Sequence, residues 1–358
     1  MRIAVDAMGG DFAPHEIVLG SFSAATDFGC DVVLVGDRDR LARELASLDP
    51  GSHGADDRKA TGRGRLSIVH ASQVVPMDEH HPAEALRHYR DSSILVACGL
   101  VAGGEADAVV SAGNTGAAFA GALLRIKRIP GIDRPAIGTV FPTVSGACFL
   151  IDAGANVDPR PHHLLSFGLM GDLYAKRVLG IKNPRVALLS NGEEEGKGNE
   201  LVYEAFHLLK SSRLNFIGNI EGKDIPLGGA DVVVTDGFTG NVVLKLAEGL
   251  GGAIISMLKE GIESGVLTRL GGLLMMPALK TLKKKMDYAE YGGAPLLGVN
   301  GVVIIAHGRS RARAVRNSIK VAVDAVTARV VEEIRDGVAG LPEPAPRGEF
   351  MKPGDTAW

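Results

Sequence analysis

A strand–turn–helix pattern that occurs twice constrains this chain more than any other feature of its sequence. The first copy is an apolar run at 109–110, followed by Ser111-Ala112-Gly113-Asn114-Thr115-Gly116 and a helix through residue 124. The second is an apolar run at 232–234, followed by Thr235-Asp236-Gly237-Phe238-Thr239-Gly240 and a helix to about residue 260. Glycine permits a sharp turn, and the N–H groups at the start of each helix suit an oxyanion, above all phosphate. Ordinary turns in which Ser and Thr only cap helices are the alternative.

Short apolar runs alternate with helical patterns along the rest of the chain. This alternation predicts an α/β fold with a mainly parallel sheet covered on both faces. Further strands are predicted at 3–6, 31–36, 66–70, 137–141, 148–151, 186–190 and 302–306, and further helices after Pro14, at 38–48, as a pair between 82 and 103, at 161–179, and from 199 to about 210. The runs at 137–141 and 148–151 are expected to pair antiparallel at or near the sheet edge. A single helix of roughly 25 residues is expected after Arg309.

Length and composition fit an α/β protein of one large or two modest domains. Residues 1–335 are predicted to form the domain, which includes an apolar and basic segment at 265–287, with a loop at 49–64. Residues 336–358, rich in Pro, Gly and charge, are predicted to be a mobile tail. The net charge of -3 argues against a nucleic-acid binder. With no uninterrupted apolar run of about 18 residues, a cytoplasmic protein is expected.

Polar residues follow several of the predicted strands. Asp6, Asn114, Asn191, Asp236 and His307 all stand at such positions, and Asn241 lies at a helix start. Because ligands bind outside the carboxyl ends of strands in open α/β sheets, these residues are predicted to meet at one edge. Lys197 and Arg309 would add positive charge there. Each residue alone has an ordinary explanation as a turn residue, so the prediction depends on their convergence.

Several common sites are excluded by spacing. No Gly-x-Gly-x-x-Gly follows a strand, so a dinucleotide fingerprint is absent. The segment 192–198 resembles a phosphate-binding P-loop, but it is one residue short and has Gly198 where Ser or Thr is required. The pairs His80-His81 and His162-His163 lack metal-ligand spacing, because adjacent residues on a helix point in different directions, and both pairs are expected to be solvated. Cys30, Cys98 and Cys148 stand far apart, so no disulfide and no metal site is predicted.

Together, these turns resemble the bacterial phosphate acyltransferase family, which converts acyl-[acyl carrier protein] and phosphate to acyl phosphate. The matching motifs are Val5-Asp6-Ala7-Met8-Gly9-Gly10-Asp11, 111–116, Asp152-Ala153-Gly154-Ala155-Asn156, Lys197-Gly198-Asn199-Glu200, 235–241 and Ala306-His307-Gly308. The resemblance extends from residue 3 to about 320. It implies a homodimeric three-layer α/β/α fold, similar to isopropylmalate dehydrogenases and phosphotransacetylases, that needs no cofactor and acts in phospholipid synthesis. One departure is 85–90, where family members tend to carry more lysine.

The chemistry of this reaction agrees with the residues that are present. No Ser-His-Asp or Cys-His arrangement is evident, and none is needed, because phosphate is itself the nucleophile and a thiolate is a good leaving group. The enzyme must hold phosphate against the thioester carbonyl and stabilise the oxyanion that forms. The candidate phosphate-binding residues are Asn114, Thr115, Gly116, Thr239, Gly240 and Asn241. The candidate catalytic residues are Lys197 and Asn191 as oxyanion donors, His307 as a proton donor to the thiol, and Asp236.

Three other functions compete with this hypothesis. A phosphotransacetylase acting on a short acyl-CoA has the same chemistry, although the apolar segment after Gly265 favours a fatty-acyl substrate. An NAD-dependent hydroxy-acid dehydrogenase would share the fold class, but it should show clustered Asp ligands for a divalent metal. A non-catalytic phosphometabolite-binding protein is the alternative outside enzymes.

Two surfaces are predicted to bind partners. An acidic acyl carrier protein is expected to dock on basic residues near the active-site edge, namely Arg125, Lys127, Arg128 and Arg313 with Arg309, Arg311 and Arg316 beside it. These residues also fit an ordinary solvated helix face. The segment 266–286 is predicted to lie on the anionic inner face of the cell membrane through Leu273, Leu274, Met275 and Met276, with Lys280, Lys283, Lys284 and Lys285 facing lipid headgroups. Such contact would deliver the product to a membrane-bound glycerol-3-phosphate acyltransferase; packing on a second subunit is the alternative.

Overall fold

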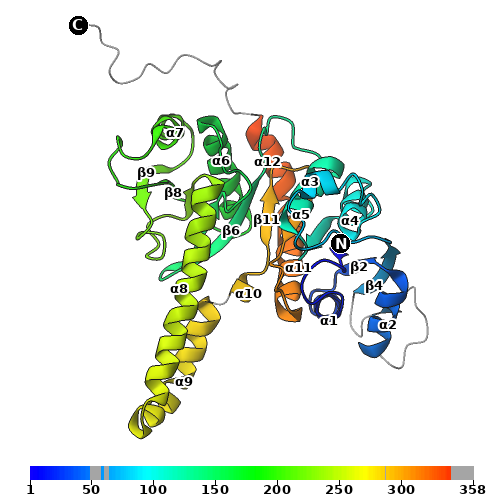
Figure 1. Ribbon diagram of the computed structural model, residues 1–358. Helices are drawn as coiled ribbons and strands as arrows, with labels where there is room; N and C mark the ends of the chain where they lie inside the picture. The colour runs from blue at the N-terminus through cyan, green and yellow to red at the C-terminus, as the bar shows by residue number, and fades with distance from the viewer. Residues whose placement is uncertain (49–57, 60–63, 287, 340–358) are drawn as a thin grey trace.

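The computed structural model describes residues 1–48, 58–59, 64–286 and 288–339. These residues form a 12-stranded sheet in the order β3-β4-β2-β1-β5-β12-β11-β6-β7-β10-β8-β9, with helices on both faces (Figure 1). One half contains the parallel strands β1 (Arg2–Asp6), β2 (Asp31–Gly36), β4 (Arg65–His70), β5 (Ala108–Ser111) and β12 (Val302–Ile305), with β3 (Arg58–Lys59) antiparallel at its edge. The other half contains the parallel strands β7 (Gly146–Ile151), β10 (Val232–Val234), β8 (Val186–Ser190) and β9 (Phe216–Glu221).

Two antiparallel strands, β11 (Ala294–Leu297) and β6 (Ala136–Thr143), join the halves and reverse the strand direction. Strand β11 is antiparallel to both β12 and β6, and β6 is antiparallel to β7. Consequently β7, β10, β8 and β9 run opposite to β1, β5 and β12 within the sheet. The expected antiparallel pair 137–141 and 148–151 is confirmed, but its predicted place near an edge is wrong. Both strands lie in the middle of the sheet because β11, which was not predicted, connects them to β12.

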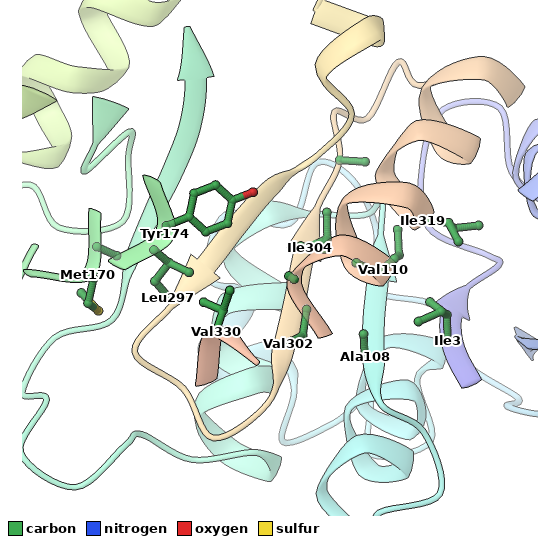
Figure 2. Close-up of a cluster of buried hydrophobic side chains, with 14 of the residues drawn as sticks. Ile3, Ala108, Val110, Met170, Tyr174, Leu297, Val302, Ile304, Ile319 and Val330 are labelled. Atoms are coloured by element: carbon green, nitrogen blue, oxygen red, sulfur yellow. The ribbon is translucent and has the colours of Figure 1, made fainter. Parts of the chain in front are cut away.

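The hydrophobic core lies on both faces of the sheet, which confirms the α/β/α layers. On one face, the helices α1 (His15–Phe28), α2 (Arg38–Leu48), α6 (Pro161–Arg177), α7 (Glu200–Lys210), α11 (Ala312–Thr327) and α12 (Val330–Val338) bury residues in one cluster. Figure 2 shows part of it, where Ile304 and Val110 of the sheet and Ile319 of α11 lie among neighbouring apolar side chains. On the other face, α4 (Ser93–Ala102) and α5 (Thr115–Arg125) cover β1, β5 and β12, and the short α3 (Pro82–Ala85) lies next to α5.

Helices α8 (Gly237–Glu263) and α9 (Val266–Met286) form an arm that projects from the body (Figure 1). Only the first turns of α8 pack on the core, through Val243, Leu244 and Ala247. The arm returns to the body through α10 (Tyr288–Tyr291), which packs on α11. Gly272 allows α9 to approach α8 closely, since a Cβ atom at this position would lie 2.4 Å from Cγ2 of Ile262. The arm is therefore an internally packed hairpin with little support from the rest of the chain.

By length and composition alone, α8 is apolar enough to cross a membrane, with 27 residues and a mean hydropathy of 1.4 over its most apolar window. The expectation of no uninterrupted apolar run of about 18 residues still holds, because Lys245 and Glu248 interrupt the apolar part of α8. In addition, the start of α8 is fixed within the body by Val243 and Leu244. The remaining turns are too short to span a hydrocarbon core of about 30 Å at roughly 1.5 Å per residue.

The C-terminal helix differs from the prediction of one long helix. It is broken into α11 and α12 by Arg329, whose φ of 53° lies in the left-handed region. Because both helices bury apolar residues in the same core cluster, the apolar spacing continues across the break and does not reveal it. Helix α12 runs to Val338, so ordered structure continues past the predicted start of the tail at 336. The rest of the predicted tail, from 340, and most of the predicted loop at 49–64 lie outside the described residues. Within that predicted loop, Arg58–Lys59 form β3, so the loop prediction is wrong there.

Candidate functional site

The first glycine turn is built around a buried carboxylate. Asp6 and Ser111 are register partners at the ends of the parallel strands β1 and β5. The Ser111 hydroxyl donates to Oδ2 of Asp6 at 2.7 Å, and the N–H of Gly9 donates to Oδ1 at 3.1 Å. The N–H of Gly113 in turn donates to the Ser111 oxygen at 3.1 Å. These bonds hold the turn after β1 and the turn after β5 against each other.

Asn114, a predicted phosphate-binding residue, uses its side chain inside the protein. Its Oδ1 accepts the N–H of Ala117 at 3.0 Å, which caps α5, and its Nδ2 donates to the carbonyls of Met77 and Glu79 at 3.2 and 3.1 Å. The amide therefore anchors the segment that precedes α3. Thr115 and Gly116 follow as the first residues of α5, where backbone N–H groups have no acceptor within the helix. An anion here would meet backbone donors and the Thr115 hydroxyl.

His307 follows β12 and lies beside the first turn along the sheet edge. The N–H of Ala306 donates to the carbonyl of Ser111 at 2.8 Å, which ties this segment to β5. The N–H of Arg309 donates to Nδ1 of His307 at 3.1 Å, so the neutral ring carries its proton on Nε2. The ring is exposed. The structure thus places His307 next to the first turn, and its role as a proton donor stays a prediction.

The second glycine turn packs on a loop whose role the sequence did not reveal. Asp152, fully buried at the end of β7, accepts hydrogen bonds from the N–H groups of Ile137, Gly154, Ala155 and Asn156 and from the Asn156 side chain, at 2.7 to 3.2 Å. Burial raises the pKa of the Asp152 carboxyl, and these donors oppose the rise. The sequence feature that could have indicated this loop is Asp152-Ala153-Gly154 directly after an apolar run.

The residues of the second turn contact this loop directly. Gly237 donates its N–H to the carbonyl of Asn156 at 2.7 Å, and Oδ1 of Asp236 accepts the N–H of Thr239 at 2.8 Å, which caps α8. Gly240 approaches the Asp152 backbone so closely that a Cβ atom would lie 1.9 Å from its carbonyl oxygen. Asn241 lies next to Gly154, with Cγ 3.6 Å from the position of a Cβ atom there. The predicted catalytic residue Asp236 therefore has a structural role as a helix cap.

Asn191 and Lys197 lie on the exposed loop after β8. The Lys197 stem crosses Gly192, since a Cβ atom on Gly192 would lie 2.8 Å from Lys197 Cγ. Asn219 on β9 supports the loop by donating to the carbonyl of Glu194 at 2.9 Å. Because β8 is parallel to β10, this loop shares its sheet edge with the second turn. The structure thus brings Lys197 and Asn191 to the side of the sheet where Asp236 begins α8.

The prediction that the polar residues after the strands all lie at one edge of the sheet is wrong, because the strands that they follow run in two directions. Asp6, Asn114 and His307 follow strands that run one way, and Asn191 and Asp236 follow strands that run the other way. The reversal comes from β11 and β6, which lie between the two sets. Nevertheless, α5 and α8 start on the same face of the sheet. Ala117 of α5 belongs to the hydrophobic cluster on that face, and Leu244 of α8 packs against it.

The predicted docking residues separate in the same way. Arg125, Lys127 and Arg128 are exposed, but they lie at the end of α5 away from Asn114, so their predicted position at the edge of the first turn is wrong. Helix α5 runs back along the sheet, and its end pairs with the residues before β12 through Arg128 and Val299. Arg313 does lie near the β12 end, paired with Glu290 at 3.1 Å. Arg311 and Arg316 also form ion pairs, with Glu16 and Asp27.

The expectation that both residues of the His162-His163 pair are solvated is wrong for His163, whereas His162 is partly exposed. His163 is buried, and it lies with His162 and Asp133 in a group whose ligand atoms are within 4.8 Å of one another. Nδ1 of His163 accepts the N–H of Arg160 at 2.9 Å, so the ring proton is on Nε2, the atom that faces Asp133. Burial lowers the pKa of His163 to about 4, which keeps the ring neutral. A histidine that binds a metal through Nε2 would carry its proton on Nδ1, which here accepts the N–H of Arg160, so this tautomer argues against a metal site.

Cys98 and Cys148 do not supply a nucleophile. Burial raises the pKa of each thiol to about 12, far above neutral pH, so neither is a thiolate. Cys30 is also buried, and its pKa is raised as well. Any group transfer at the two turns therefore proceeds without a cysteine intermediate.

Comparison with known proteins identifies relatives over almost the whole chain. Residues 1–333 match a family model described as fatty acid synthesis protein. The chain is 51% identical over 341 residues to the phosphate acyltransferase of Pelotomaculum thermopropionicum, covering 95% of this chain and 96% of that protein. It is 52% identical over 336 residues to the phosphate acyltransferase of Moorella thermoacetica, covering 94% and 95%. The fold is similar to a phosphotransacetylase from Streptococcus pyogenes, with a TM-score of 0.61 at 18% identity over 93% and 94% of the two chains.

Proposed function

Since this chain belongs to the fatty acid synthesis protein family and is an acyltransferase with phosphate acyltransferases as its relatives, we propose that it transfers a fatty acyl group from acyl-[acyl carrier protein] to inorganic phosphate. The product would be an acyl phosphate for glycerol-3-phosphate acylation in phospholipid synthesis. The observation that carries this proposal is the match over residues 1–333, which includes both glycine turns. The reaction belongs to the cytoplasmic side of the cell membrane.

In the proposed reaction, an oxygen of hydrogen phosphate attacks the carbonyl carbon of the thioester. A C–O bond forms, the C–S bond breaks, and the proton carried by phosphate ends on the sulfur of the leaving thiol. Holding the two reactants in this geometry supplies much of the rate enhancement, and no covalent enzyme intermediate is required. The absence of a thiolate among Cys30, Cys98 and Cys148 is consistent with this direct attack.

We propose that both turns contribute to one phosphate site, through Asn114, Thr115 and Gly116 and through Thr239, Gly240 and Asn241. Both turns start helices on the same face of the sheet. Neighbouring strands of a sheet are rotated relative to each other by about 20–25°. Five such pairings separate β5 from β10, so the carboxyl ends of these two strands no longer point in opposite directions. Lys197 and Asn191 are proposed as oxyanion donors, His307 as the proton carrier to the thiol, and Asp236 as the residue that fixes the second turn.

Thiol release tests the proposed function directly. The purified protein is expected to release thiol from palmitoyl-carrier protein only when phosphate is present, and to form palmitoyl phosphate in equal amount. Acetyl-CoA with phosphate is the matched comparison, because a phosphotransacetylase would prefer it. Faster turnover of acetyl-CoA would favour that alternative, and no phosphate-dependent release with either donor would overturn acyl transfer to phosphate by this chain.

Docking of the carrier protein is proposed on the exposed basic residues at the end of α5. Arg125→Glu with Lys127→Glu is expected to raise the KM for acyl-carrier protein about tenfold at low salt, with a smaller effect at high salt, because charge complementarity acts on the association rate. Arg128 is left unchanged, since its guanidinium donates to the carbonyl of Asp133. Arg313→Glu tests the other predicted docking residue, which pairs with Glu290 near the β12 end, and a raised KM in this variant alone would place docking there instead. An unchanged KM at both salt concentrations would remove Arg125 and Lys127 from the docking surface.

Membrane contact is proposed through α9 of the arm. Leu273, Leu274, Met275 and Met276 are 65%, 80%, 58% and 43% exposed. The side chains of residues 281–289, including the predicted lysines at 283–285, lie outside the described residues.

The apolar face of α8 that includes Val242, Leu246 and Leu250 is proposed as the contact with a second copy of the chain, because it is exposed and continuous with the body.

Replacement of Leu274 and Met275 by Glu distinguishes membrane contact from dimer contact. Loss of co-sedimentation with anionic liposomes is expected, with oligomer mass and activity on soluble substrates unchanged, because burying each apolar side chain in the lipid boundary contributes roughly 1.5–3 kcal/mol. Leu246→Glu on α8 is the control, and it is expected to change oligomer mass. Dissociation of the Leu274→Glu, Met275→Glu protein into monomers, or liposome binding equal to wild type, would contradict the membrane assignment.

A further inference from the structure

Asp6 forms more hydrogen bonds than any other side chain of the first turn, and the proposed reaction gives it no role. It is 3% exposed, and both of its oxygens are occupied. Oδ1 accepts the N–H groups of Met8 and Gly9 at 3.4 and 3.1 Å, and Oδ2 accepts the Ser111 hydroxyl at 2.7 Å. Ser93, at the start of α4, also forms a hydrogen bond to the carboxyl. One side chain thus links β1, β5, α4 and the turn after β1.

The two turns that Asp6 links touch each other at glycine. A Cβ atom on Gly9 would lie 2.7 Å from Cα of Gly113 and 2.5 Å from Oδ2 of Asp6. Gly113 directly precedes Asn114, the cap of α5, so its position determines where the first N–H groups of α5 point. The Ser111 hydroxyl, itself oriented by Asp6, accepts the N–H of Gly113. A shift of Asp6 would therefore move the start of α5 through two successive hydrogen bonds.

A small pocket lies directly behind the turn. Its lining includes Asp6, Ser93, Ser111, Gly113 and Asn114. Burial raises the pKa of the Asp6 carboxyl, although Ser93, Ser111 and the N–H groups of Met8 and Gly9 favour its charged form. The carboxylate is a poor neighbour for phosphate, so it would act on the anion through the groups that it positions.

We propose that Asp6 is a positioning residue for the phosphate that reacts, holding the Gly9 and Gly113 turns so that the N–H groups of Thr115 and Gly116 meet the anion. This inference rests on the proposed use of phosphate as acyl acceptor, and it adds a residue that the phosphate does not touch. It implies that the side chain at position 6 must have the size and hydrogen-bonding geometry of Asp, but that it need not be charged. An amide can meet this requirement, because its oxygen accepts the N–H of Gly9 while its NH2 group donates to the Ser111 hydroxyl, which can act as donor or acceptor.

The test compares Asp6→Ala with Asp6→Asn. Asp6→Ala is expected to reduce kcat/KM for phosphate about 100-fold, mainly through KM, with an unchanged KM for the acyl donor, because a displacement of about 1 Å is enough for such a loss. Asp6→Asn is expected to remain within about fivefold of wild type, because the hydroxyl of Ser111 can reverse its hydrogen bond. An Asp6→Ala protein with wild-type phosphate KM would overturn the proposal. So would an Asp6→Asn protein as impaired as Asp6→Ala, which would show that the charge itself is required.

Ser111→Ala gives a second route if Asp6→Ala does not fold. This variant removes the acceptor for Gly113 and leaves Asp6 bonded to Gly9, so an increase of about tenfold in phosphate KM is expected, with a melting temperature close to wild type. A wild-type phosphate KM in Ser111→Ala would contradict the proposal as well. Wild-type enzyme is assayed in parallel with the same acyl donor. If wild type shows no phosphate-dependent thiol release, the proposed function fails, whereas loss in the variants alone concerns Asp6.

Discussion

Replacing Asp152 with alanine is expected to lower the free energy of unfolding by at least about 4 kcal/mol, since each buried donor left without an acceptor costs about 1–3 kcal/mol. Asp152 accepts from four backbone N–H groups and the Asn156 side chain, and it is fully buried. Alanine removes all of these acceptors at once, and the N–H groups of Ile137 and Asn156 and the Asn156 side chain are left without an acceptor in the buried part of the loop. Denaturant unfolding followed by circular dichroism would measure the loss.

Asparagine is not expected to rescue this position. Whichever oxygen of Asp152 is replaced by NH2, the new donor faces N–H groups, because both oxygens accept from donors that cannot reverse. This distinguishes Asp152 from Asp6, which has Ser111 as a reversible partner. Asp236→Asn is the matched control in the adjacent turn, because Asn and Asp cap helices almost equally well. Asp152→Asn as stable as Asp236→Asn would show that the loop does not depend on the carboxylate.

A second large effect is expected at Gly240, where alanine should cost about 3 kcal/mol or more, because overpacking against backbone cannot be relieved by a rotamer change. A Cβ atom there would lie 1.9 Å from the carbonyl oxygen of Asp152, so α8 or the loop would have to move. Helix α8 begins in the second turn, and this turn packs on the loop. Catalysis should therefore decline together with the melting temperature in Gly240→Ala.

The control for Gly240→Ala lies on the same helix. A Cβ atom on Gly252 would have no neighbour within 4 Å, and alanine there should stabilise the helix by roughly 0.5–1 kcal/mol. Thermal unfolding of both variants separates the helix propensity of alanine from the contact with Asp152. If Gly240→Ala melts at or above the temperature of Gly252→Ala, the close approach between α8 and the β7 loop is not required for stability.

Much of the fold could be predicted from the sequence because local patterns determined it. The helix at 38–48 and the strands at 31–36 and 186–190 have the predicted bounds. These segments have clear apolar periodicity and end at turn residues. In contrast, β9 and β11 were missed. β9 contains Gly218 at a register shift, and β11 has only four residues, one of which is Pro295.

The limits of the site prediction have a related cause. The repeated turn identified residues that start helices at strand ends, and the structure has Asn114 and Asp236 in these positions as caps. Their relative placement depended on the direction of the strands between them. That direction is set by β11 and β6, a pairing between residues about 160 positions apart in the chain, such as Leu296 and Ile137. Sequence periodicity contains no information on such pairing, so the opposite directions of β5 and β10 could not be predicted.

The roles of Asp6 and Asp152 as buried hydrogen-bond acceptors also could not be predicted from the sequence, although both residues lie in motifs that resemble those of the family. An acidic residue after an apolar run fits a solvated turn, a helix cap and a buried acceptor equally well. Only the three-dimensional structure shows that each carboxylate is surrounded by N–H and hydroxyl donors from other segments.

The strand order also determines when each part of the sheet can form during synthesis on the ribosome. The strands β6, β7, β10, β8 and β9 are contiguous in the sheet and come from residues 136–221 and 232–234, so they can pair as soon as that stretch has emerged. Strand β12 lies between β5 and β11 but is made only at Val302–Ile305. A nascent chain therefore exposes one whole side of β5 while almost two hundred further residues are translated. During that interval this unpaired edge can pair with another chain, and its protection depends on α4 and α5 or on a chaperone.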